Sequence, residues 1–367
     1  MTLPASERRA QILSAVRQFG TVRVVELADR LEMSAVTLRR DLTALAVAGQ
    51  LHRSHGAVTV GASAALAAPE VPAAPEASEA ASARPVPSVG MLVPTVGSYF
   101  DEIIGGARAA AGGARLVLGI AAYGARDDQA QVAHLLEESV DGLLLSPNWS
   151  PEARGGLDWL AELPVPAVLV ERRAEPGRRA ADLDSVASDH RHGVLLALRH
   201  LASLGHDSVL LAARDDSWTA HQVRAGYAEG VRHLGMTPLP VLDVRDPQSP
   251  EAGQAEVVRL ADRIAHLAGE GVHAVLVHND HEAVQLPMLL RARGLRVPDD
   301  VALISYDDVF AALAAPPLTA VAPPRRAVGA TAMELLLRRL EGGATVPARR
   351  VDLLPALNVR GSCGALC

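Results

Sequence analysis

The sequence predicts an α/β protein in which two doubly wound parallel-sheet lobes follow a small winged helix-turn-helix domain. From residue 88 onward, short unbroken apolar runs alternate with helical segments, which is typical of parallel strands covered on both faces. An Ala- and Pro-rich stretch separates this part from residues 1–60. A length of 367 residues also indicates more than one domain.

Residues 1–60 begin with three predicted short helices. Apolar side chains recur at helical spacing within residues 12–19 and again within residues 27–31. Ser34 can cap a third helix, because its hydroxyl can accept a hydrogen bond from a free amide of the first turn. The apolar face of this third helix consists of Leu38, Leu42 and Leu45.

The opposite face of the third helix carries Arg39, Arg40 and Thr43. Arginines on such a face can reach phosphates and guanine edges in a major groove. The helix pattern alone fits a plain solvated surface equally well. Two strands, Leu51–Arg53 and Ala57–Thr59, would follow as a wing with the residues between them at its tip.

Residues 7–59 resemble the head of the DeoR family. The matching stretches are ERRAQIL, VVELADRLEMSAVTLRRDL and GQLHRSHGA. The wing departs from the family's Arg-x-His-Gly-Gly, because Ala57 stands in place of the second Gly. The resemblance implies DNA binding by Ser34, Thr37, Arg39, Arg40, Thr43, Arg53 and His55.

The charge is divided in a way that suits this interpretation. The chain has a net charge of −7 and contains no lysine. Residues 1–60 hold eight Arg and five Asp or Glu, a balance of +3, whereas the remainder has a balance of −10. Positive charge is therefore concentrated where a phosphate backbone would require it.

Residues 61–87 predict a semi-flexible linker. This stretch contains eleven Ala and five Pro, and the prolines forbid a continuous helix. We expect a two-lobed body over 88–361 and a tail over 362–367. The first lobe would comprise about 88–187 and 309–342, and the second about 188–306 and 343–361.

The body shows eight candidate strands with helices between them. A chain crossing between the lobes is expected at Ser185–Asp189. The strands are Val89–Val93, Arg115–Ile120, Gly142–Leu145, Ala167–Val170, Val209–Ala212, Val241–Val244, Ala274–Val277 and Val301–Ser305. Helices expected between the strands include Asp101–Ala111, Asp127–Glu138, His190–Leu204, Ala220–Leu234, Glu251–Gly269 and Glu282–Arg293.

Residues 88–361 resemble the effector-binding body of the LacI/GalR repressors, which have the periplasmic-binding-protein fold. The matching stretches include VGMLVPTVGSYFDEIIGGARAAA, VASDHRHGVLLALRHLASLGH and GLRVPDDVALISYDD. We find no sequence of the hinge helix that LacI-type proteins carry; the linker occupies its place. The chain thus resembles a DeoR-like head joined to a LacI-like body.

Polar and aromatic residues gather after the strands of this body, where open α/β sheets bind ligands. Aromatic faces together with carboxylates and amides are typical of a sugar-type pocket. The alternative is that strand-end residues such as Ser188 and Asp280 only cap the following helices. The residues expected to bind an effector are Ser98, Tyr99, Phe100, Trp149, Glu171, Trp218, Arg224, Asn279 and Asp307.

Two of these positions depart from the LacI pattern. Glu171 stands where that family usually has Asp. The family's Arg-x-x-Gly-aromatic element has Val223 at its Arg position, and Arg224 is one place late, so Trp218, His221 or Arg224 are the candidates to replace it.

Other candidate sites are weaker. The donors His278, Asp280 and His281 lack a firm metal spacing. A basic run formed by residues 172–173 and 178–179 could meet a phosphorylated effector, although a solvated loop fits it better. No Ser-His-Asp or paired-carboxylate arrangement stands out. We expect no metal, no cofactor and no enzymatic activity.

Three features of the sequence indicate the cellular compartment of the protein. No run of about 18 apolar residues occurs, and the N-terminus lacks the pattern of a signal peptide. The two cysteines, Cys363 and Cys367, exclude a disulfide framework for the core. We expect a cytoplasmic protein without a membrane partner.

These features predict a ligand-responsive transcription regulator, most simply a repressor controlled by a sugar or a related polar effector. Operator DNA and a second copy of the chain would be its partners, because paired half-sites multiply a weak single-head affinity. One alternative is a DNA-binding head fused to a sugar-phosphate-processing enzyme. A second is an extracytoplasmic solute-binding protein.

Overall fold

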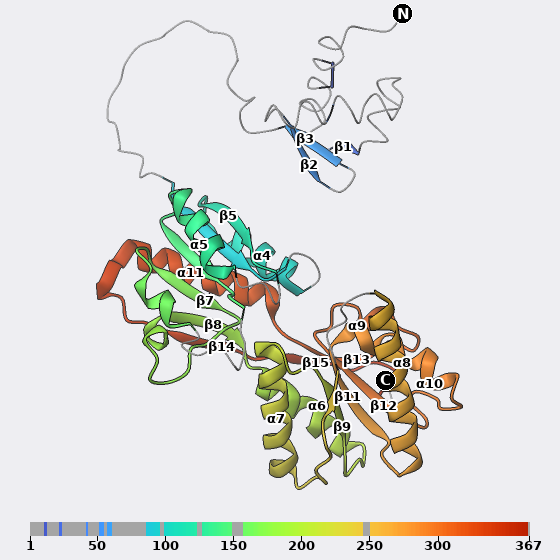
Figure 1. The fold of residues 1–367 in the computed structure, drawn as a ribbon. Helices are drawn as coiled ribbons and strands as arrows, with labels where there is room; N and C mark the ends of the chain where they lie inside the picture. The colour runs from blue at the N-terminus through green and yellow to red at the C-terminus, as the bar shows by residue number, and fades with distance from the viewer. Residues whose placement is uncertain are drawn as a thin grey trace, which may run out of the picture. The chain divides into compact units, whose positions relative to one another are not determined.

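The computed structural model describes residues 11–12, 22–23, 42, 51–54, 57–60, 86–95, 99–122, 127–148, 157–244 and 250–365. They fall into two compact units, Met1–Ala83 and Arg84–Cys367 (Figure 1).

The first unit contains a three-stranded antiparallel sheet in the order β1-β3-β2. Its strands are β1 (Val22–Arg23), β2 (Leu51–Ser54) and β3 (Ala57–Val60). The pairing of β2 with β3 confirms the predicted wing. Ile12 and Leu42, which the sequence placed on apolar helix faces, are both fully buried.

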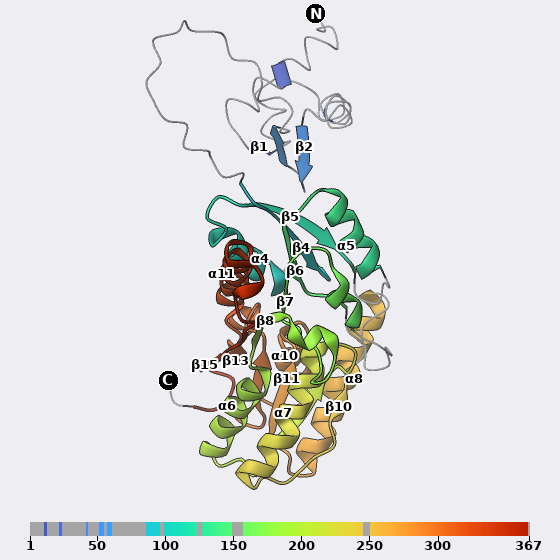
Figure 2. The ribbon, with the colours of Figure 1, turned by 90° about the vertical axis from the view of Figure 1, so that its left-hand side faces the viewer.

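The second unit has two lobes, and the first is built on a six-stranded parallel sheet in the order β14-β8-β7-β6-β4-β5. Helices α4 (Tyr99–Ala109) and α11 (Arg325–Gly342) pack on one face. Helix α5 (Asp128–Glu137) and the 3-10 turns η2 (Asp158–Glu162) and η3 (Arg179–Asp182) cover the other (Figure 2). The strands are β4 (Ser88–Val93), β5 (Arg115–Ile120), β6 (Gly142–Leu145), β7 (Ala167–Val170), β8 (Asp184–Ser188) and β14 (Arg350–Leu353).

The second lobe repeats this plan with the strand order β10-β9-β11-β12-β13-β15, in which only β15 is antiparallel to its neighbour. Helices α6 (His190–Ser203) and α7 (Trp218–Leu234) cover one face. Helices α8 (Pro250–Gly269), α9 (Asp280–Ala283) and α10 (Leu286–Arg291) cover the other. The strands are β9 (Leu210–Ala213), β10 (Leu242–Asp243), β11 (Ala274–His278), β12 (Ala302–Tyr306), β13 (Thr319–Ala322) and β15 (Ala356–Asn358), and a short 3-10 turn is η4 (Ala311–Leu313). A further 3-10 turn, η5 (Gly343–Thr345), follows α11 in the first lobe.

The two doubly wound lobes confirm the predicted fold class, but the lobe boundaries differ from the expectation. Residues 309–322 belong to the second lobe, because β13 pairs with β12. Residues 350–353 belong to the first lobe, because β14 pairs with β8. The chain therefore passes between the lobes after β8, after β13 and after β14.

Two elements also differ from the predicted ones. The crossing expected at Ser185–Asp189 follows directly after a buried strand, β8 (Asp184–Ser188), which the sequence did not indicate because Asp184, Ser185 and Ser188 are polar. The expected helix over 282–293 is split into α9 and α10. Pro287 lies in the first turn of α10, where its missing N–H is tolerated, so a new helix begins there.

Helices α4 and α11 approach each other very closely through two glycines. A Cβ at Gly106 would overlap the backbone carbonyl of Arg326, and one at Gly329 would overlap that of Ile103. At the preceding residue, Gly105, the atom nearest to such a Cβ is the end of the Arg326 side chain, at 3.4 Å. Only the glycines at the contact are therefore required for this packing.

Candidate effector pocket between the two lobes

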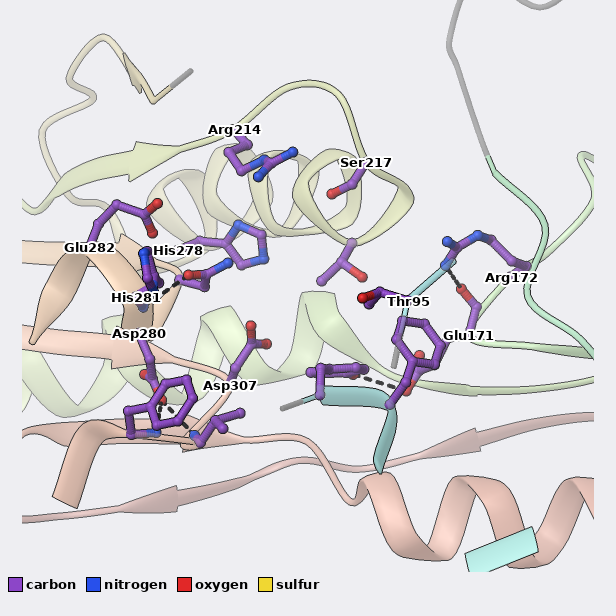
Figure 3. A pocket seen from close by; sticks show the side chains of 16 residues that line it. Thr95, Glu171, Arg172, Arg214, Ser217, His278, Asp280, His281, Glu282 and Asp307 are labelled. Carbon is purple, nitrogen blue, oxygen red and sulfur yellow. Dashed lines mark hydrogen bonds between the residues drawn. The ribbon is translucent and has the colours of Figure 1, made fainter. Parts of the chain in front are cut away.

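A cavity of about 380 Å³ lies between the two lobes of the second unit. Thr95, Tyr99, Phe100, Glu171 and Arg172 line it from the first lobe. Figure 3 shows Glu171 and Arg172 on one side and Asp280, Glu282 and Asp307 on the other. The wall from the second lobe consists of Arg214, Ser217, Thr219, His278, Asn279, Asp280, His281, Glu282, Asp307, Val309 and Phe310.

Five of the nine expected effector residues lie in this wall: Tyr99, Phe100, Glu171, Asn279 and Asp307. Most of them stand at the carboxyl end of a strand, as expected for ligand residues of parallel sheets. Ser98 and Trp149 lie outside the described residues. Trp218 and Arg224 do not line the cavity.

Arg224 is used to hold the backbone beside the cavity. Its guanidinium donates to the carbonyl oxygens of Arg214 at 2.6 Å and Ala213 at 2.5 Å, and it pairs with Asp243 at 2.7 Å. These contacts anchor the end of β9 to α7. The expectation that Arg224 substitutes for a ligand arginine is therefore not supported by its geometry.

Glu171 lies at the end of β7 and is fully occupied by donors of the protein itself. The Ser188 hydroxyl and the Tyr99 hydroxyl donate to its Oε1 at 2.7 and 3.1 Å. The Ser188 amide lies 3.1 Å and His190 Nε2 3.3 Å from its Oε2. Glu171 therefore braces the first crossing between the lobes while it lines the cavity.

The electrostatics of Glu171 agree with this brace. Burial alone would raise the pKa of this carboxyl, but the hydrogen bond and charge of His190 and the donors of Ser188 outweigh it, and the pKa is lowered. Burial, and then the negative charge of Glu171, raise the pKa of Tyr99 well above 10. The pair thus persists as a carboxylate and a neutral phenol.

His190 extends this network into the second lobe. Its Nδ1 lies 3.2 Å from the hydroxyl of Tyr306, and that hydroxyl also donates to the His190 carbonyl oxygen at 3.2 Å. His190 and Tyr306 are both almost completely buried. Hydrogen bonds therefore join the end of β7, the start of α6 and the end of β12 behind the cavity.

The residues after β11 combine capping with unused polar atoms. The Asn279 side chain accepts from the amide of His281 at 3.0 Å and so caps α9. Asp280 Oδ2 accepts from the amides of Val309, Phe310 and Ala311 at 2.5 to 3.3 Å. The capping alternative thus holds for Asn279, whereas Asp280 fixes the loop after β12.

Several buried atoms here have no hydrogen-bond partner in the described part of the chain: Asp280 Oδ1, Glu282 Oε2, Asp307 Oδ1 and His278 Nδ1. Burial, and then the charge of Asp280, raise the pKa of Asp307 to about 7. Burial also raises the pKa of Glu282. Burial lowers the pKa of His278 to about 3, which keeps this imidazole neutral.

Of the basic run over 172–179, only Arg172 reaches the cavity. Its guanidinium donates to the carbonyl oxygens of Pro147 at 2.6 Å and Glu171 at 2.7 Å. Arg173 pairs with Asp352, and the other two arginines pair with acids of η2 on the surface. The run as a whole is thus not a phosphate site.

The sequence prediction missed His278, Glu282, Arg214 and Phe310 as lining residues. His278 is the last residue of β11, and its position could have been read from the strand. Glu282 and Phe310 enter through short helical turns whose direction depends on packing. Arg214 lines the cavity while its guanidinium is paired with Asp216 at 2.8 Å.

All seven residues expected to contact DNA lie outside what the structure describes, except for the backbone of Arg53 in β2. Within the described residues, no helix is long and apolar enough to cross a membrane. The two lobes and the polar cavity between them define a ligand-binding protein of the periplasmic-binding-protein type.

Two family models match the chain. Residues 198–363 match the periplasmic binding protein-like domain. Residues 8–64 match the DeoR-like helix-turn-helix domain. The second match covers the charged N-terminal part and the wing.

Curated relatives are regulators of transcription. The HTH-type transcriptional regulator DegA of Bacillus subtilis is 26% identical over 283 residues, 76% of this chain and 78% of the relative. The HTH-type transcriptional repressor CytR of Escherichia coli K12 is 26% identical over 288 residues, 75% of this chain and 79% of the relative.

Solved structures share the fold. A LacI family regulator from Mycobacterium smegmatis is 29% identical, with a TM-score of 0.60 over 75% of this chain and 98% of that one. The complex of the regulator CelR with cellobiose has a TM-score of 0.63, 24% identity and coverage of 90% and 91%. The lac repressor dimer bound to operator has a TM-score of 0.64, 23% identity and coverage of 77% and 96%.

The chain is a ligand-responsive transcription regulator that joins a DeoR-like helix-turn-helix head to a periplasmic-binding-protein-like body, and this body is similar to that of LacI-family regulators.

Proposed function

We propose that this regulator is a cytoplasmic repressor whose affinity for operator DNA is set by a small polar effector in the cavity between the lobes. The cavity carries the proposal, because residues with unpartnered polar atoms line it between the two lobes. An effector that prefers one arrangement of the lobes shifts the equilibrium between arrangements.

The effect on DNA follows from linkage. If the two arrangements present the heads of a homodimer differently, the effector changes operator affinity by the ratio of its own affinities for them. Two heads on paired half-sites bind far more tightly than one, so a change in their spacing is sufficient.

Removing both arginines of the predicted recognition helix tests the DNA-binding half of this proposal. We expect Arg39→Ala with Arg40→Ala to weaken operator binding more than tenfold, since each lost contact to DNA costs about 1–3 kcal/mol. The measurement is a gel-shift titration on an operator selected from genomic DNA by its binding to the wild-type protein.

Arg108→Ala with Arg263→Ala is the matched control, because it removes the same charge from exposed positions of the body. The control should retain wild-type operator affinity. If the Arg39/Arg40 variant keeps the wild-type midpoint of the gel-shift titration, the predicted third helix is not the element that recognises operator DNA.

A further inference from the structure

We propose that the effector carries a protonated amine, and that this amine binds the acidic wall formed by Asp280, Glu282 and Asp307. The ligand class is an amine-bearing polyol, such as an amino sugar. This inference rests on the proposed function only in taking the cavity as the effector site.

Three carboxylate oxygens in the wall lack donors. Among the residues that the structure describes, Asp280 Oδ1, Glu282 Oε2 and Asp307 Oδ1 have no hydrogen-bond partner, although the exposed fractions of these residues are only 2%, 5% and 8%. A buried acceptor without a donor costs free energy. The three residues line the cavity, so a ligand in it lies next to the carboxylates that lack donors.

The negative charge of this wall is not balanced by the surrounding cations. Arg214 is paired with Asp216. The guanidinium of Arg325 donates to the backbone carbonyls of Asp307 and Asp308. None of the three wall carboxylates forms an ion pair with another described residue. Neutral hydroxyls would supply hydrogen bonds here but would leave the charge uncompensated, whereas an ammonium supplies both.

The titration of Asp307 supports the same conclusion. Its raised pKa comes from burial, then from Asp280, with Glu171 adding to it and with His190 and Arg325 opposing it. The surrounding protein groups by themselves therefore favour a proton on this carboxyl. A cationic group of a ligand can take over the charge that this proton provides.

The rest of the cavity suits a polyol or a sugar ring. Phe100 enters from the first lobe and Phe310 from the second, and the hydroxyls of Ser217 and Thr219 line the same space. Aromatic faces pack on C–H surfaces, while hydroxyls exchange hydrogen bonds with those of a polyol.

Calorimetric titration of the full chain tests the inference with matched pairs of compounds. D-glucosamine and D-galactosamine are compared with their neutral N-acetyl derivatives, and D-glucamine is compared with sorbitol. We expect at least one amine to bind ten times more tightly than its neutral partner. The inference would be overturned if both members of every pair bound equally, or if none of the three amines bound. It would also be overturned if millimolar Mg²⁺ or Ca²⁺ displaced a bound amine.

Variants locate the amine. Asp307→Asn and Glu282→Gln should each weaken amine binding at least tenfold while changing neutral-partner binding less than threefold. Glu270→Gln, which removes an exposed carboxylate of the same lobe, should leave both unchanged. An amine that binds both cavity variants like wild type would contradict the assignment.

Operator titrations separate this inference from the proposed function. A neutral polyol that binds the cavity and changes operator affinity would uphold the function and reject the amine. An amine that binds the wall and leaves operator affinity unchanged would uphold the amine site and reject the proposed function.

Discussion

At Asp307, burial and the neighbouring Asp280 act on one carboxyl group, and both favour its protonated form. Its φ of 97°, like the 52° of Glu171, is uncommon for a residue other than glycine. Both residues end strands at the cavity, where the surrounding contacts hold this conformation. They differ in that Glu171 has four donors and Asp307 has an oxygen with none.

The raised pKa of Asp307 makes stability depend on pH. Between its ordinary 3.8 and about 7, the folded protein keeps a proton that the unfolded chain has released. The free energy of unfolding therefore falls as the pH rises through this window, by at most about 4 kcal/mol, and then levels off. We expect Asp307→Asn to remove this part of the slope in urea unfolding between pH 5 and 8.

The control for this profile is Asp182→Asn, which changes an exposed carboxylate of η3. It should keep the wild-type slope. A wild-type slope in Asp307→Asn itself would show that another group titrates in this window.

For single residues, the sequence predicted which side chains lie at the cavity better than it predicted what each of them contacts. Asp307 and Asn279 were placed at the pocket because parallel strands bring their carboxyl ends together. The internal role of Glu171 depends on Ser188 and His190, which lie 17 and 19 residues away. No local pattern reports such a contact.

Among the elements, the pair α4 and α11 depends most on single residues. Gly106→Ala would place a methyl group against the carbonyl of Arg326, and neither backbone can yield easily. Because overpacking costs about 1–3 kcal/mol, we expect Gly106→Ala to lower the free energy of unfolding by that amount.

Gly105→Ala is the matched control in the same helix, since its methyl would meet only the end of a flexible side chain. It should be neutral or stabilising by up to about 1 kcal/mol, because Ala favours the helix over Gly. Thermal unfolding of both variants decides. Equal stability of the two would mean that the helices separate readily at this point.

The sequence predicted apolar strands well and polar or late ones poorly. The candidate at Gly142–Leu145 matches β6, and Ala167–Val170 matches β7. Strand β8 was missed because its residues are polar. Strands β14 and β15 at the lobe edges were also missed, since alternating exposed residues such as Arg350–Leu353 carry only half of an apolar pattern.

For the whole molecule, the head and the two lobes followed from charge distribution, periodicity and motif resemblance. The lobe boundaries did not, because three crossings distribute the C-terminal segment between both sheets. Which lobe a short strand joins depends on the strand to which it is hydrogen-bonded, and the local amino-acid sequence does not reveal that strand.

The linker over 61–87 joins the DNA-binding head to the body, and its length can be changed to test how the two communicate. Its prolines and alanines suit a tether that sets the effective concentration of the heads. We expect an insertion of five Gly/Ser residues near Ala77 to change operator affinity only a few-fold and to preserve the effector response. Operator titrations with and without effector measure both.

The opposite result would be equally clear. If the insertion variant binds effector normally but no longer responds at the operator, the linker transmits the signal as an ordered element. An insertion of the same length at Gly343, the first residue of η5 in the first lobe, serves as the length control and should preserve both activities.

The edge strands β14 and β15 have a consequence for synthesis in the cell. Each is the edge strand of a different sheet, and only two residues separate them. Until β14 and β15 have been synthesised, the buried strands β8 and β13 are the edges of the two sheets, and such edges invite pairing with other chains. In the complete fold β14 and β15 take over these two edge positions, and their alternating exposed residues suit an edge that faces water.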